Sequence, residues 1–367
     1  MPSTVFVLGA GFSMNKGLPS QAAFADALLS ERFNSNHDKC ITVIIRKFLE
    51  DVFDISTPDK YPSLEDAFTF IDLSAGTGHN LGREYSPKKL RAIRRMLIHR
   101  VFKILDDDYD VKNPLCIHNF FDSIPNLAQN SANYCFVILN WDIVLENELL
   151  SYPITSPIDY CCDGMNLDPY YAPNTPPLRL CKMHGSSNWV YCDNCRNLYF
   201  KLNEKQALTA GADINRSDFI PFKSLLEMNN LEFTQSDYDN IPKQNCTCGN
   251  PLSYHIATFS YRKSFRNPAY SMIWSRAEKY LSHAQNWVFI GYSLPDADFE
   301  LKHLLKTAQL QNQTQKHIMI IDKGPDAELK YQRIFGREIK YFGKTLDDSI
   351  ALKALNKMLM ISTDKRN

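Results

Sequence analysis

Short apolar runs recur along the chain, each bounded by Gly, Asn or Asp and followed by residues with helical spacing of apolar positions. Five runs have the length of a buried strand, at Thr4–Leu8, Tyr134–Leu139, Leu178–Met183, Trp287–Ile290 and His317–Ile321. Continuous apolar runs of this length are typical of parallel strands that are covered on both faces. Strands that alternate with helices predict an α/β fold built on a doubly wound parallel sheet.

Two stretches interrupt this alternation and are expected to be insertions. Residues 34–130 carry only helical patterns, including a capping-box-like start at Ser63-Leu64-Glu65-Asp66, and predict a helical insertion. Residues 191–253 are polar and contain four cysteines in two pairs, which predicts a small separate module. The sheet domain would then comprise 1–33, 131–190 and 254–362. The segment Pro153–Pro177 contains six prolines and is expected to be a long loop without a regular element.

Composition narrows the classes of function. The 41 Lys and Arg residues balance the 41 Asp and Glu residues, so neither nucleic acid nor a membrane surface is expected as the main ligand. An apolar content of 44% excludes disorder for most of the chain. No export signal or membrane-length apolar run is visible, which predicts a soluble cytoplasmic protein. In that reducing compartment the ten cysteines are expected as thiols or metal ligands, not disulfides.

The first chemical motif is Gly9-Ala10-Gly11-Phe12-Ser13, which lies between the first strand and the first helix. Glycines at such a turn let backbone N–H groups approach a phosphate, although they also serve close packing. The third glycine of the dinucleotide fingerprint is missing, and no acidic residue marks the end of a second strand. This departure argues against an ordinary hydride-transfer enzyme.

Polar residues also follow the second and third strands, at Asn140-Trp141-Asp142 and at His184-Gly185-Ser186. Taken one at a time, Asn140 is typical of a turn, Asp142 is typical of a helix N-cap, and His184 is typical of a hydrogen-bonded histidine in the core. Ligand sites of open α/β sheets lie at the carboxyl ends of the strands, so these side chains are expected to converge on the glycine turn. The convergence predicts a ligand site there.

The cysteine pairs form a second constellation, Cys192-x-x-Cys195 and Cys246-x-Cys248, separated by fifty residues. Four thiolates satisfy a tetrahedral zinc ion, and a site closed by four protein ligands is structural. The sequence therefore predicts a zinc-ribbon-like module, with a decayed site of free thiols as the alternative.

In their order along the chain, these motifs resemble those of the sirtuin family. The resemblance includes Gly17-Leu18-Pro19 after the glycine turn and Gly291-Tyr292-Ser293 after a later strand, and it extends from residue 4 to about 322. It implies a Rossmann-like domain that binds NAD⁺ and cleaves its nicotinamide–ribose bond.

The resemblance also implies roles for individual residues. Asn140 would position the ribose hydroxyls or a water molecule, Asp142 would bond the nicotinamide carboxamide, and His184 would act as base toward a ribose hydroxyl. The rest of the NAD⁺ would be bound by Gly9, Ala10, Gly11, Ser13, Gly291, Ser293 and Asp322. Zinc would be held by Cys192, Cys195, Cys246 and Cys248.

Two departures from the protein-deacylating sirtuins concern peptide recognition. Their Phe-Gly-Glu signature is absent from Ile256–Arg262, and Pro19 is not followed by x-Phe-Arg. With water as the acceptor the reaction is hydrolysis to nicotinamide and ADP-ribose, as in the sirtuin-like NAD⁺ hydrolases of bacterial anti-phage defence. An NAD⁺-dependent deacylase or ADP-ribosyltransferase and a non-catalytic NAD⁺ or ADP-ribose sensor remain as alternatives.

A toxic NAD⁺ hydrolase implies control by a regulatory protein partner, a nucleotide signal or assembly into a homo-oligomer. The segment Ser63–Leu73 carries more apolar side chains than one narrow helical stripe uses. These side chains indicate either deep core or a subunit interface.

Overall fold

The computed structural model describes residues 1–19, 23–54, 61–107, 115–153, 156–166, 176–202, 214–234, 244–253, 268–296, 298–312 and 315–364. Within these ranges, seven parallel strands form the main sheet in the order β10-β9-β8-β1-β2-β5-β3. Its strands are β1 (Thr4–Leu8), β2 (Tyr134–Ile138), β3 (Ile158–Asp159), β5 (Leu178–Lys182), β8 (Asn286–Ile290), β9 (His317–Ile321) and β10 (Ile339–Phe342). The five apolar runs are therefore confirmed as strands.

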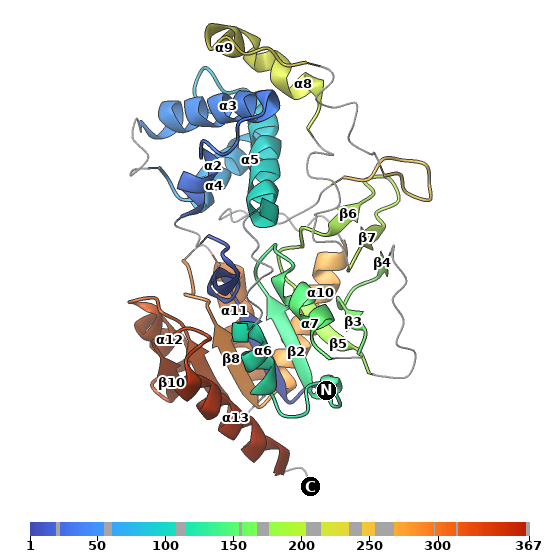
Figure 1. Ribbon diagram of the computed structural model, residues 1–367, viewed down its shortest axis with the longest axis vertical. Helices are drawn as coiled ribbons and strands as arrows, with labels where there is room; N and C mark the ends of the chain where they lie inside the picture. Colours follow the sequence, from blue (N-terminus) through green and yellow to red (C-terminus); the bar gives the residue numbers. More distant parts are fainter. Residues whose placement is uncertain are drawn as a thin grey trace.

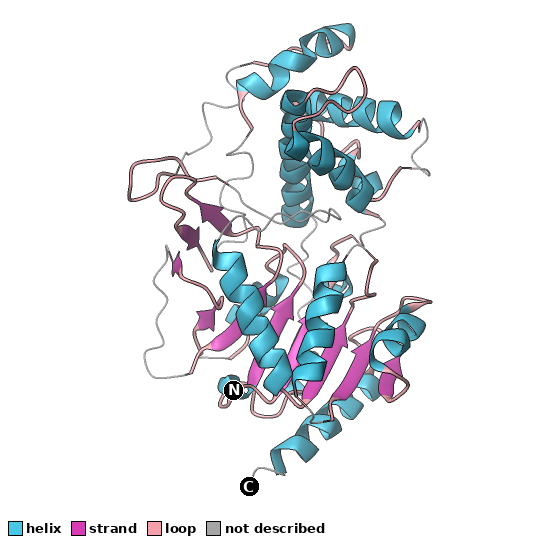
Figure 2. Cartoon of the chain, turned by 180° about the vertical axis from the view of Figure 1, so that it is seen from behind, coloured by secondary structure: helices cyan, strands magenta, loops and turns pink. Residues whose placement is uncertain are grey.

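Helices cover both faces of this sheet, so the fold is a doubly wound α/β fold (Figures 1 and 2). One face carries α6 (Leu115–Asp122), α7 (Val144–Ser151) and α13 (Ser349–Asp364). The opposite face carries α10 (Pro268–His283), α11 (Phe299–Gln311) and α12 (Ala327–Phe335). Every residue of β1, β2 and β8 is buried between the two layers, as expected for central parallel strands.

A helical unit stands beyond the carboxyl ends of the strands (Figure 1). It contains α2 (Phe24–Leu28), α3 (Asn36–Phe53), α4 (Leu64–Thr77) and α5 (Pro87–Asp107). The Ser63 side chain accepts a hydrogen bond from the N–H of Asp66, so the capping motif begins α4 as expected. Helix α4 buries Leu64, Phe68 and Ile71 but leaves Phe70 43% exposed and Leu73 46% exposed.

The hydrophobic core of the helical unit draws on more of the chain than residues 34–130. Phe24 and Phe33 belong to it, and so do Phe219 and Leu226 from the second insertion. The latter segment consists of α8 (Arg216–Phe219), η4 (Ile220–Phe222) and α9 (Lys223–Met228), and it lies beside α3 (Figure 1). In contrast, α6 packs in the core of the sheet domain.

The segment Pro153–Pro177 contains strands in its described part, so the expectation of a loop without a regular element is wrong. Strand β3 extends the main sheet, and β4 (Gly164–Asn166) joins β6 (Trp189–Tyr191) and β7 (Leu198–Phe200) in a small sheet. Strands of two or three residues are too short to show periodicity, and proline is tolerated at a sheet edge. The remaining short elements are α1 (Ala10–Ser13), η1 (Met14–Lys16) and η3 (Ser131–Asn133). Over the described ranges, no helix has the length and apolar character needed to cross a bilayer.

Candidate functional site

Three polar side chains meet at the carboxyl ends of β1 and β2. Ser13 Oγ donates to Asp142 Oδ2 over 2.8 Å. Asn140 Nδ2 donates to the Gly9 carbonyl over 2.9 Å and to Ser13 Oγ over 3.0 Å. All three side chains are buried. The glycine turn and the Asn140–Asp142 loop, distant in sequence, are thus joined as the strand ends predicted.

Asp142 is held on two sides. Its Oδ1 accepts the Val144 N–H at the start of α7 over 3.0 Å, while its backbone carbonyl accepts a bond from Lys182 Nζ. Lys182 also pairs with Glu146 at 3.1 Å, and both of these side chains are fully buried. Because a buried charge is stable only when it is paired, this ion pair fixes the end of β5 against the Asp142 loop.

His184 is oriented from both ring nitrogens. Its Nδ1 lies 3.1 Å from the Leu139 carbonyl, which can only accept, so Nδ1 carries the proton in this contact. Its Nε2 lies 3.6 Å from Asp298 Oδ1, and Asp298 Oδ2 accepts the Tyr292 hydroxyl over 2.9 Å. With the Nδ1 proton directed at the Leu139 carbonyl, Nε2 is the ring nitrogen that faces the Asp298 carboxylate.

The glycine turn packs directly against the turn that follows β8. The Gly11 N–H donates to the Gly291 carbonyl over 2.9 Å, so this N–H is used within the protein and does not face a ligand. A Cβ on Gly11 would lie 2.6 Å from Gly291 Cα, and one on Gly9 would lie 2.5 Å from Gly291 O. Gly291 itself has a φ of +60°. These glycines are required for backbone contact, the packing alternative named above.

The other residues expected to bind NAD⁺ lie along the same edge of the sheet. Ala10 and Ser293 are exposed on the two packed turns. Asp322 follows β9 and is buried, and burial raises the pKa of its carboxyl group. Its Oδ1 accepts the Gly324 N–H over 2.7 Å. The structure therefore brings strand ends β1, β2, β5, β8 and β9 to one edge, with Asp322 on the β9 side.

Several residues of the site were missed by sequence reasoning. In the sequence, Lys182 looks like the polar end of a strand and Glu146 like an ordinary helix residue. A Lys inside an apolar run was nevertheless a signal of a buried ion pair. Asp298 lies just before α11, a position at which an acidic residue is usually interpreted as the helix N-cap. Its approach to His184 depends on tertiary structure and has no local signature.

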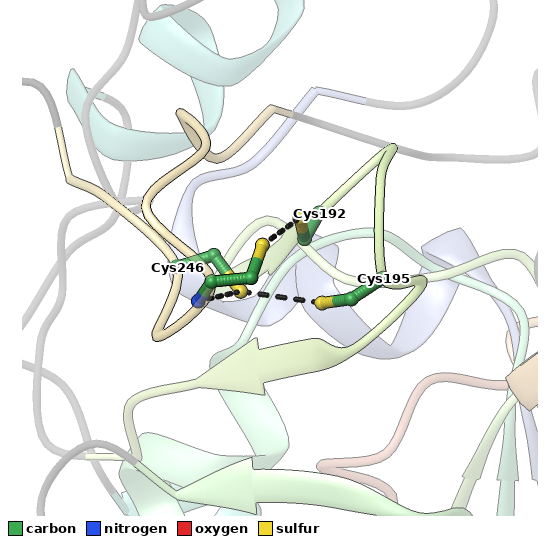
Figure 3. Close-up of side chains that lie close together, drawn as sticks. Cys192, Cys195 and Cys246 are labelled. Atoms are coloured by element: carbon green, nitrogen blue, oxygen red, sulfur yellow. Dashed lines mark hydrogen bonds between the residues drawn. The ribbon is translucent and has the colours of Figure 1, made fainter.

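The four cysteines form a cluster beside the small sheet. Figure 3 labels three of them, Cys192, Cys195 and Cys246. Their sulfur atoms lie within 4.8 Å of one another, with Cys192 to Cys248 at 3.5 Å and Cys195 to Cys246 at 3.3 Å. Tetrahedral zinc with bonds of about 2.3 Å needs sulfurs roughly 3.8 Å apart, so the group fits the ion after small adjustments. The cluster thus agrees with the ligand set expected from the sequence.

Polar donors surround these thiols. Asn250 Nδ2 lies 3.4 Å from Cys248 Sγ, and the side chain and N–H of Asn250 lower the pKa of Cys248 to about 5. The Tyr199 hydroxyl lies 3.0 Å from Cys246 Sγ. Donors that stabilise thiolates are the usual outer partners of a zinc site, because zinc binds the deprotonated sulfur.

No protein-family model matches the chain, and no curated protein matches it. Among solved structures, it is similar to a mutant Sir2 homologue bound to ADP-ribose, with 12% identity and a TM-score of 0.37 over 98% of this chain and 93% of that one. It is also similar to Sir2 bound to a p53 peptide and NAD⁺, with 13% identity and a TM-score of 0.39 over 99% and 93%. At these values the likeness assigns neither a family nor a reaction.

Proposed function

We propose that the protein is a sirtuin-like enzyme that hydrolyses NAD⁺ to nicotinamide and ADP-ribose. The observation that carries the proposal is the buried group of Ser13, Asn140 and Asp142 beside an oriented His184. The motif order assigns NAD⁺ cleavage to Asn140, Asp142 and His184, and NAD⁺ binding to Ser13. Their meeting at one sheet edge is the arrangement that such a site requires.

The chemistry follows from these positions. The bond between ribose C1′ and the nicotinamide nitrogen breaks, and its electron pair leaves with nicotinamide. The ribose then has oxocarbenium character, which fixed dipoles in a site with little water stabilise. Water adds to C1′ and loses a proton, which His184 Nε2 would accept directly or through a ribose hydroxyl. This nitrogen lies 3.6 Å from Asp298 Oδ1.

Among the described residues, no donor bonds to Asn140 Oδ1, so this oxygen can serve as an acceptor in this step. Both of its hydrogen bonds to described residues come from Nδ2, which leaves Oδ1 to accept from a ribose hydroxyl or the attacking water. Asp142 would bond the nicotinamide carboxamide. The Asp142 oxygens already accept from Ser13 and Val144, so this contact would share or replace the Ser13 bond.

Water is favoured over an acyl-lysine acceptor by the sequence. Ile256–Arg262 lacks the Phe-Gly-Glu signature, and Pro19 lacks the x-Phe-Arg that follows it in deacylases. The Ile256–Arg262 segment lies outside the described residues, as does 254–267 as a whole. A peptide substrate is therefore disfavoured by the residue types of these two segments.

Product analysis tests the proposal. The purified chain is incubated with NAD⁺, with and without an acetylated lysine peptide, and the products are identified by chromatography and mass spectrometry. Hydrolysis predicts nicotinamide and ADP-ribose in equal amounts, with or without peptide. Consumption of NAD⁺ only with peptide would identify a deacylase. Transfer of ADP-ribose to protein would identify a transferase, and NAD⁺ binding without turnover would identify a sensor.

The proposed setting is anti-phage defence, in which exhaustion of NAD⁺ stops the infected cell, and such an activity needs control. Among the described residues of the insertion, Phe70 and Leu73 on α4 are its exposed large apolar side chains, and they support self-association through this helix. Light scattering over a concentration series, read with specific activity, tests the idea. A strict monomer with constant activity per molecule would exclude assembly as the control.

A further inference from the structure

A second group of metal-ligand side chains lies in the helical unit, apart from the four cysteines. His37 and Asp38 stand in the first turn of α3, and His99 stands on α5. One ligand atom of each lies within 4.8 Å of the other two. The two imidazole rings meet with centroids 5.5 Å apart and an angle of 67°. The group therefore joins two helices that are separated in the sequence by α4.

Two atoms of the group lack a hydrogen-bond partner among the described residues. These are His99 Nδ1 and Asp38 Oδ1, and their side chains are almost entirely buried, with 8% and 2% exposure. Buried polar atoms without partners are rare because they lose their hydration without replacement. An ion or a water molecule bound by the group would supply the missing partners.

Two cations adjoin Asp38 and oppose a metal ion. Arg100 Nη2 lies 3.8 Å from Asp38 Oδ1, but it is held by the Asp38 carbonyl and by Thr42. Lys103 Nζ lies 2.7 Å from Asp38 Oδ2, where Ser35 Oγ also donates over 2.6 Å. The Lys103 side chain is 33% exposed, so it can turn toward water when another cation arrives. Of the two, Lys103 is the more easily displaced.

We propose that His37, Asp38 and His99 bind a second zinc ion that ties α3 to α5. Two imidazoles and one carboxylate are a ligand set suited to zinc, and water would complete the coordination. The nearby Arg100 and Lys103 weaken the affinity, so this ion is expected to leave to a chelator before the ion held by the cysteines.

Metal analysis of the full chain tests the proposal. Protein dialysed against zinc is expected to hold two ions per chain, one at each ligand group, and mild chelation should remove one. His99→Gln should lose one ion, and His37→Gln, at a half-buried position less critical for folding, should lose the same one. Lys103→Met should tighten the labile site by about tenfold, because a unit charge a few ångströms away is removed.

Cobalt substitution identifies which group binds. Only the cysteine cluster gives thiolate-to-cobalt charge-transfer absorption, so the second ion should add weak visible bands without it. His303→Gln, at an exposed position on α11, is the matched control and should keep both ions. A single zinc in the wild type at saturation, or two ions in a folded His37→Gln variant, would overturn the proposal. Neither the metal content nor the cobalt spectrum depends on NAD⁺ turnover.

Discussion

The Trp141 indole meets the Phe102 ring edge to face, with centroids 6.3 Å apart. Trp141 stands between Asn140 and Asp142, yet it is buried in the core of the helical unit, where it also contacts Phe68. Its neighbours Leu139 and Val144 pack in the core of the sheet domain. The loop that carries two candidate site residues is thus anchored in both cores.

This anchor predicts that a change in the helical unit alters NAD⁺ turnover. Phe102→Leu should lower stability by about 1 kcal/mol and reduce turnover, because Trp141 loses an edge-to-face partner. Phe48→Leu is the matched control, since Phe48 is equally buried in this core but packs on Phe53 and Tyr85. Urea unfolding and NAD⁺ assays compare the two. Equal turnover in both variants would show that packing around Trp141 does not couple the helical unit to the candidate site.

Asn140 and His184 should differ in what their loss changes. Asn140→Ala should abolish turnover and, because two hydrogen bonds disappear, lower stability by about 1–2 kcal/mol. His184→Ala should lower turnover by about 10²- to 10⁴-fold and retain NAD⁺ binding, since other residues are proposed to contact the nucleotide. Calorimetric titration separates binding from turnover. Unchanged hydrolysis in the Asn140→Ala protein would reject the site.

Asp298 is expected to be a positioning residue for His184. Asp298→Asn keeps the shape and the Tyr292 bond but removes the negative charge facing Nε2. We expect turnover to fall by about tenfold or more with little change in NAD⁺ affinity, and the pH profile of turnover to shift. Tyr292→Phe, which removes only the support of Asp298, should give a smaller effect in the same direction. A changed affinity with an unchanged pH profile would point to a structural role.

Asp322 gives a prediction about stability and pH. Burial raises the pKa of its carboxyl group in the folded chain, so folding favours the protonated form. The stabilisation is present in acid and is lost as the pH rises through the folded pKa. Asp322→Asn keeps an acceptor for the Gly324 N–H without the charge. The variant should melt at a higher temperature near neutral pH, with the gain shrinking in acid; a gain independent of pH would contradict this cause.

The cysteine cluster should hold one zinc ion that stabilises the small sheet. Cys246→Ser should lose that ion and loosen the contacts around Tyr199, without directly affecting His184 chemistry. Cys116→Ser is a suitable control because Cys116 packs against the sheet domain core instead. Elemental analysis and limited proteolysis report the two effects. Full zinc content in the Cys246→Ser protein would exclude this residue as a ligand.

Much of the sheet was predictable because buried parallel strands leave an unmistakable apolar run. The meeting of Ser13, Asn140 and Asp142 was also predictable, since the ends of adjacent parallel strands lie at one edge. The packing of α8 and α9 against the helical unit was not predictable, because Phe219 and Leu226 are apolar side chains that fit either core. The same holds for Trp141, whose neighbours in sequence pack in the other core.

The central position of β1 has a consequence for how the chain is made. Thr4 pairs with Tyr134 on one side and with Asn286 on the other, so this strand has neighbours that are synthesised much later. Until then its four apolar residues, Val5 to Leu8, stay exposed to solvent and to other chains. Long-range pairing of this kind slows folding and favours aggregation. β1 is paired on both sides only after β8 has emerged, so the contact of the glycine turn with Gly291 cannot form before then.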